Sequence, residues 1–170
     1  MWVFDATPLI YLAKVEALTL VKDLDGSCII PERVYDEVVT NGLENDHSNA
    51  RRVERGIDDG YFEVRPVQND RRFARLQTNS HLSDADVAVL VLADSQDGVA
   101  VMDETYGRDV AAAEEITTRG TAYVVLSLTK QGAISDDDAR TVIDEMIDAG
   151  WYCAPDVYTK IVRQIEDFAD

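Results

Sequence analysis

The chain has 170 residues, of which 46% are hydrophobic, and it carries a formal net charge of −17. This length and this hydrophobic content predict a folded domain with a substantial core and exclude a disordered chain. We expect a single domain over residues 1–170, with the core and its site in 1–123 and a helical C-terminal extension in 124–170 packed on it.

Acidic charge opposes binding to nucleic acid, because the field of the whole molecule repels phosphates. Here the acids are 22 Asp and 11 Glu and the bases 12 Arg and 4 Lys, a bias that we associate with proteins working in concentrated salt. At molar salt the Debye length is about 3 Å, so this repulsion is screened and nucleic acid stays among the candidate partners. Residues 51–75 carry a local excess of Arg, for which contact with phosphate and a solvated helix face both remain open. The candidates are Arg51, Arg52, Arg55, Arg71, Arg72 and Arg75.

The sequence contains neither a membrane-length or signal segment nor a cysteine framework. No apolar run has membrane length and no signal-peptide pattern precedes the first strand, so we expect a cytoplasmic protein without membrane contact. Cys28 and Cys153 suggest neither a disulfide framework nor a thiolate zinc site, and we expect both to be small buried residues.

The first predicted strand, Trp2–Phe4, ends at Asp5, and a helix follows in which Thr7 can act as the cap. In an open α/β sheet the carboxyl ends of the strands border the crevice where ligands bind. Asp5 is therefore either a turn or capping acid or a member of a ligand site.

The second strand, Ser27–Ile30, leads into a helix that starts at Pro31 and places Glu37 one to two turns in. Glu37 can reach the crevice, although a solvated helix position is the alternative. A short edge strand is expected at Tyr61–Val64.

Ser83 opens the next helix, with Asp86 in its first turn as a site residue or as the far half of a capping box. The strand Val99–Met102 is followed directly by Asp103, which repeats the placement of Asp5 or caps the helix expected over Thr105–Thr118. The remaining elements are a strand at Thr121–Leu126 and two helices, which begin at Ser135 and after Pro155.

Strands that alternate with helices predict an α/β fold, a three-layer α/β/α sandwich around a mostly parallel sheet of four to five strands. Four carboxylates meeting at the carboxyl edge of such a sheet repel one another unless a cation neutralises them. Oxygen ligands suit Mg²⁺ or Mn²⁺, as one or two ions. A site of this kind indicates hydrolysis of phosphodiester bonds.

These residues, in this order, resemble the PIN-domain ribonucleases. The match comprises Asp5–Ala13, Ile30–Val38, Leu82–Ala93 and Asp103, and the first motif with residues 123–134 is similar to the archaeal and bacterial subgroup of VapC toxins. The resemblance implies a metal-dependent endoribonuclease that acts on RNA, pairs as a homodimer and, in many toxins, is held by a small antitoxin chain.

Carried over by position, the catalytic and metal-binding acids are Asp5, Glu37, Asp86 and Asp103. The resemblance makes Thr7 a hydroxyl near the first acid, while Asp84 competes with the preferred Asp86 and Glu104 is a possible accessory.

Two other functions remain open. The first is a catalytically silent PIN-fold subunit that binds RNA or serves in assembly. The second is a receiver-like module whose acidic pocket accepts a phosphoryl group, with Lys130 as the required cation.

Overall fold

Five short parallel strands form one sheet in the computed structural model, which describes residues 1–169. Their order across the sheet is β3-β2-β1-β4-β5. The strands are β1 (Trp2–Phe4), β2 (Cys28–Pro31), β3 (Glu63–Arg65), β4 (Val99–Val101) and β5 (Thr118–Arg119).

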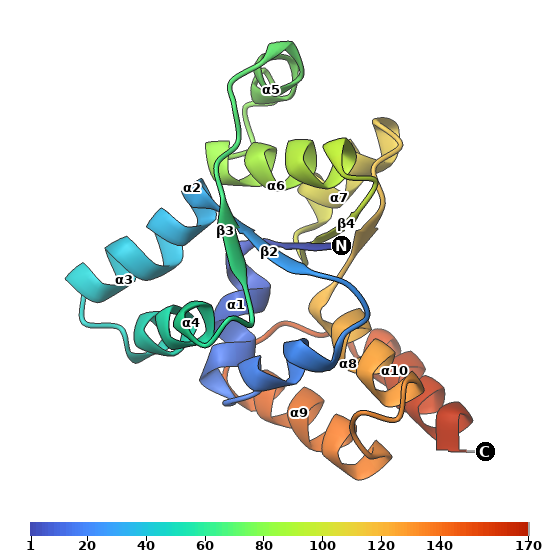
Figure 1. Ribbon diagram of the computed structural model, residues 1–170. Helices are drawn as coiled ribbons and strands as arrows, with labels where there is room; N and C mark the ends of the chain where they lie inside the picture. Colours follow the sequence, from blue (N-terminus) through green and yellow to red (C-terminus); the bar gives the residue numbers. More distant parts are fainter. Residues whose placement is uncertain (170) are drawn as a thin grey trace.

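Helices cover both faces of this sheet, which confirms the predicted three-layer α/β/α architecture (Figure 1). The helical segments include one 3₁₀ segment, η1, and one π-helical segment, η2. In chain order they are α1 (Ala6–Lys14), η1 (Leu18–Asp23), α2 (Glu32–Tyr35), η2 (Asp36–Thr40), α3 (Asn41–Glu44), α4 (Ser48–Asp58), α5 (Arg71–Gln77), α6 (Asp84–Ser95), α7 (Thr105–Ala113), α8 (Thr121–Lys130), α9 (Asp136–Asp148) and α10 (Pro155–Ala169).

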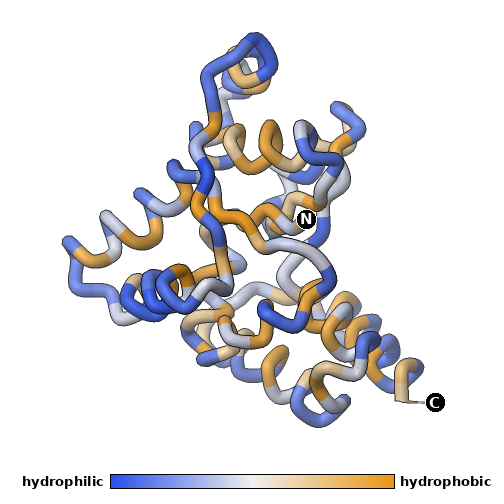
Figure 2. Tube along the Cα trace, in the orientation of Figure 1, coloured by the Kyte–Doolittle hydropathy of each residue, from blue (hydrophilic) through white to orange (hydrophobic). Residues whose placement is uncertain are grey.

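The central strands are buried on both sides, as expected for a parallel sheet between two helical layers. Every residue of β1 and β2 is buried, and α6, which packs on β1, β2 and β4, buries eight of its residues. Figure 2 shows the same pattern as a band of hydrophobic residues through the central strands and along α6. The high apolar content of these segments therefore reflects their place in the core.

The C-terminal helices pack on the layer that contains α1. Helix α10 contacts α8 and α9, and α9 reaches α1. In these helices Ile143, Met146, Ile161 and Ile165 are buried, so α9 and α10 each pack an apolar face inward.

Two predicted elements differ from the structure. Residues 121–126 belong to helix α8, and the fifth strand is the two-residue β5 before it. Val124, Val125 and Leu128 are buried at helical spacing, and a short apolar run alone does not separate a strand from a buried helix. The helix expected to reach Thr118 ends at Ala113, because Glu115 adopts a left-handed conformation with φ of 60° that turns the chain into β5.

No helix among residues 1–169 is both long enough and apolar enough to cross a membrane.

Candidate functional site

Asp5 lies where the chain order of the sheet changes direction. From β1 the chain first adds β2 and β3 on one side and then crosses to β4 on the other, so β1 and β4 flank the switch point. Ligands of open α/β sheets bind in the crevice at such a point, beyond the carboxyl ends of the strands. The backbone N–H of Asp5 donates to the carbonyl of Val101 at 3.0 Å, which joins the ends of these two strands.

The Asp5 side chain is buried and begins helix α1. Its Oδ1 accepts a hydrogen bond from the N–H of Ala6 at 2.8 Å, and the residue is 6% exposed. Asp5 is therefore the N-cap, and the expectation that Thr7 caps this helix is wrong. Thr7 lies half-buried in the first turn, and no hydrogen bond joins it to Asp5 within the described chain.

Asp103 follows β4, and its carboxylate is held by residues distant in sequence. Its Oδ1 accepts from the N–H of Thr121 at 2.7 Å, and its Oδ2 accepts from Thr121 Oγ1 at 2.7 Å and from Trp151 Nε1 at 3.0 Å. Asp103 thus accepts from the first residue of α8, whose N-cap is Gly120, and does not cap the following helix α7. A carboxylate has about four acceptor positions, so these three bonds leave about one of them open.

We expect Trp151→Phe to lower the free energy of unfolding by about 1.5 kcal/mol or more, because it removes a hydrogen bond to a charged group. The aromatic ring stays in a site that is 8% exposed. The matched control is Trp2→Phe, since Trp2 is also 8% exposed but donates to a neutral carbonyl, that of Asp25, at 2.9 Å. Urea denaturation measures both variants, and equal losses would show that the charge of Asp103 adds nothing.

Asp86 has the capping role that the sequence left open, while its role as a site residue stays a prediction. Its Oδ2 accepts from the N–H of Ser83 at 2.8 Å, and its own N–H donates to Ser83 Oγ at 3.1 Å, so it completes the capping box of α6. Its charge also raises the pKa of both Asp5 and Glu37. Asp84, the competing residue, is exposed and accepts from Gln77 Nε2 at 2.8 Å. Of the two acids of this helix, Asp86 is therefore the one whose charge acts on Asp5 and Glu37.

Glu37 lies in the π-helical segment η2, within the continuous run of helix from α2 to α3. Such π-bulges occur frequently at functional sites, and the sequence pattern did not predict this one. Glu37 borders a hollow of about 130 Å³. Partial burial and the charge of Asp86 raise the pKa of its carboxyl group. Glu104, the suggested accessory, is exposed at the start of α7 and caps it with no side-chain bond.

The electrostatics of Asp5 combine all four predicted acids. The pKa of Asp5 is raised to about 7, mainly by burial and also by the charges of Asp86, Glu37 and Asp103, while the hydrogen bond from the Ala6 N–H lowers it. Within residues 1–169, none of the four acids forms an ion pair with a basic side chain. A buried carboxylate beside three others, without a basic partner, is an environment that a cation would stabilise.

The donor set fits a hard divalent cation. All candidate ligands are carboxylate oxygens, which Mg²⁺ and Mn²⁺ prefer. In the part of the chain that the structure describes, however, no three such side chains are close enough together to form a preformed metal cluster. The four acids are thus electrostatic neighbours rather than an assembled ligand shell.

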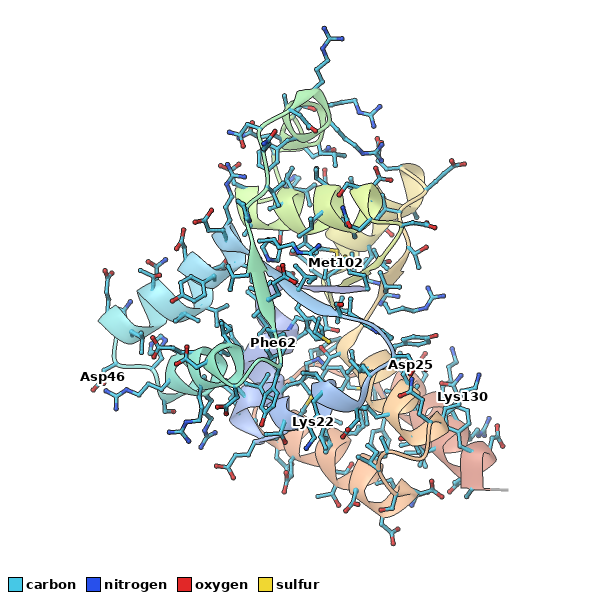
Figure 3. All side chains as sticks on the ribbon, viewed as in Figure 1. Lys22, Asp25, Asp46, Phe62, Met102 and Lys130 are labelled. Atoms are coloured by element: carbon cyan, nitrogen blue, oxygen red, sulfur yellow. The ribbon has the colours of Figure 1, made fainter. Side chains whose placement is uncertain are left out.

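The predicted RNA-binding arginines do not form one surface. Helices α4 and α5, which carry them, lie well apart in Figure 1, with α5 at the top and α4 beside α1. In Figure 3, Asp46, the partner of Arg51, lies at the periphery, far from Met102, which precedes Asp103. Four of the six form ion pairs, Arg51 with Asp46, Arg52 with Glu16, Arg72 with Asp94 and Arg75 with Glu114. Arg55 and Arg71 form none within residues 1–169.

Two residues of the site were missed by the sequence analysis, Thr121 and Trp151. Both hold Asp103 from the C-terminal part of the chain, and no local pattern connects them to it. Lys130, the cation of the receiver-like hypothesis, lies exposed at the last turn of α8 and well away from Met102 in Figure 3. That hypothesis therefore lacks its basic residue at the acidic site.

Comparison with known proteins gives one match. A family model described as a PIN domain matches residues 1–167. Neither the curated proteins nor the solved structures include a match to the chain.

Proposed function

Because the chain belongs to the PIN-domain family, we propose that it is a metal-dependent endoribonuclease that hydrolyses phosphodiester bonds of RNA. PIN domains are generally nucleases and usually use divalent metals such as Mg²⁺. The observation that carries the proposal is the buried Asp5 at the switch point, with Glu37, Asp86 and Asp103 as acidic neighbours and no basic partner among the described residues.

Three of the four acids keep carboxylate oxygens available for a cation. Oδ2 of Asp5, Oδ1 of Asp86 and both oxygens of Glu37 accept no hydrogen bond within residues 1–169. We assign these three as the main ligands of one or two Mg²⁺ or Mn²⁺ ions. Asp103, whose acceptors are mostly used, completes the site through its remaining position or through water.

A bound divalent cation supplies charge neutralisation and Lewis-acid stabilisation of the phosphoryl oxygens during in-line displacement. The chain itself supplies positioning. Glu37 is suited to orient the attacking water, since one of its two unoccupied carboxylate oxygens can bind the cation while the other accepts from the water. Thr121 and Trp151 keep Asp103 in one orientation.

Purified protein incubated with single-stranded and structured RNA tests the proposal. We expect cleavage with Mn²⁺ or Mg²⁺, in low and in molar KCl, and none after chelation with EDTA. Metal binding without cleavage of any RNA would instead favour the catalytically silent subunit.

PIN-domain nucleases often pair with antitoxins, and we extend the proposal to a homodimer held by a small antitoxin chain. The exposed hydrophobic side chains in the C-terminal region support a partner surface there, Tyr152 at 86%, Val157 at 42% and Phe168 at 39% exposure. The bias toward Asp and Arg supports a cytoplasm with concentrated salt as the working environment.

A further inference from the structure

A hollow of about 520 Å³ lies between helix α7 and the edge strand β5. Its walls carry two arginines, Arg108 from α7 and Arg119 from β5, together with threonines and one acid, Asp109. We call it the Arg108–Arg119 groove. It lies outside residues 51–75, where the sequence placed the candidate phosphate contacts.

Both arginines of the groove are available to an anion. Arg108 and Arg119 are exposed, and neither pairs with an acid among residues 1–169, Asp109 included. Arg119 donates from Nη1 to the carbonyl of Thr118 at 2.8 Å, which leaves its other N–H groups free of protein acceptors in the described chain. Guanidinium groups bind phosphate through several donors at once, so this pair is suited to contact phosphate on a strongly acidic molecule.

The groove adjoins the candidate site at Gly120. A Cβ atom at Gly120 would lie 2.9 Å from Oδ1 of Asp103 and 3.8 Å from Nη1 of Arg108. Arg108 and Asp103 therefore approach the same point from two sides, and only a glycine leaves that point open. An anion held by Arg108 would therefore lie near Oδ1 of Asp103, where a bound cation would offset the repulsion between the two negative charges.

An exposed aromatic ring extends the groove beyond Arg119. The guanidinium of Arg119 lies over the ring of Tyr123, 5.0 Å from its centroid, and Tyr123 is 42% exposed. Unpaired bases stack on aromatic rings and on arginine planes, whereas bases inside a duplex are not accessible to them.

We propose that the Arg108–Arg119 groove binds the backbone of single-stranded RNA and leads it to Asp103, with one unpaired base stacked beside Tyr123. The inference rests on the nuclease function proposed above. It assigns the polyanion contact to α7, β5 and α8 instead of α4 and α5.

The test is fluorescence anisotropy with a labelled, unpaired oligoribonucleotide in EDTA, so that binding is measured without cleavage. We expect the double variant Arg108→Ala with Arg119→Ala to bind RNA roughly tenfold more weakly, or worse, at low salt. The slope of log affinity against log salt concentration should become shallower by about 1.4, because each lost phosphate contact removes about 0.7 from it. The matched control is Lys160→Ala with Arg163→Ala, which removes two charges from exposed positions on α10 and should change affinity by less than about twofold.

Tyr123 is tested by two variants, because its ring also packs on Trp2 with centroids 6.1 Å apart. Tyr123→Phe keeps the stacking face and should bind RNA as the wild type does, whereas Tyr123→Ala should weaken binding about fivefold or more.

The proposed role of the groove would be overturned if the arginine double variant bound RNA with the affinity and salt dependence of the wild type. It would also be overturned if the α10 control lost as much affinity as that variant. Equal binding of a fully paired duplex would overturn its preference for single strands. Normal binding by the groove variant together with metal-dependent cleavage refutes the groove alone. Groove-dependent binding without cleavage under any metal condition refutes the nuclease function and leaves the groove standing.

Discussion

Replacing Asp5 by Asn is expected to reduce RNA cleavage at saturating Mn²⁺ by at least about a hundredfold, because even outer-shell partners of a metal site typically contribute 10- to 100-fold. Asn has nearly the same shape as Asp, and its side-chain oxygen can still accept the hydrogen bond from the Ala6 N–H. The substitution therefore removes the charge while keeping the cap of α1. Initial rates with a defined RNA substrate measure the effect.

Asp84→Asn is the matched control for this experiment. It removes the same charge from an exposed acid of α6 that bonds Gln77, and we expect less than a twofold change in rate. If Asp5→Asn cleaves at the wild-type rate, the assignment of Asp5 to the site is wrong. If both variants lose activity equally, the effect is one of overall charge.

Asp5→Asn is also expected to stabilise the metal-free protein at pH 8, by raising its free energy of unfolding by at most about 4 kcal/mol. Burial and the neighbouring acids raise the pKa of Asp5 from 3.8 to about 7 in the folded state. Between these two pH values the folded protein keeps a proton that the unfolded chain has released. The contribution of Asp5 to stability is thus present at low pH and is lost as pH rises through about 7.

The difference in unfolding free energy between Asp5→Asn and the wild type should consequently be small near pH 4 and grow up to about pH 7. Urea denaturation in EDTA across this range measures it. Asp84→Asn should show the opposite and smaller effect at pH 8, since an acid in the first turn of a helix is stabilising. A constant difference across the range would contradict the shifted pKa of Asp5.

Addition of Mn²⁺ at pH 8 should stabilise the wild type relative to Asp5→Asn and so narrow the difference between them. A ligand present at about a hundred times its dissociation constant adds about 2.7 kcal/mol to the state that binds it. We expect this gain for the wild type and its loss in Asp5→Asn. Equal stabilisation of both proteins would place the cation elsewhere.

Local sequence patterns predicted most of the strands of the sheet and located two of the candidate acids, Asp5 and Asp86. Trp2–Phe4 is a buried strand that ends at an acid, and this pattern needs no distant residue to be recognised. The capping signal at Ser83 likewise located the start of α6 and, with it, Asp86. The predicted strand at residues 121–126 failed for a physical reason, because a short apolar run packs equally well as a strand or as a buried helix. The start of this helix is also held by a distant residue, since the carboxylate of Asp103, 18 residues earlier, accepts from the N–H of Thr121.

The sequence by itself determined the fold class and singled out the four acids as candidates, since both depend on the order of strands, caps and carboxylates along the chain. Only the tertiary structure decided what surrounds those acids. Trp151 donates to Asp103 across 48 residues, and Arg108 and Asp103 both lie close to Gly120. The tertiary structure also places four of the six predicted arginines in ion pairs, on two separate helices. Burial, ion pairing and proximity arise from packing between distant segments, and that packing leaves no periodic signal in the sequence.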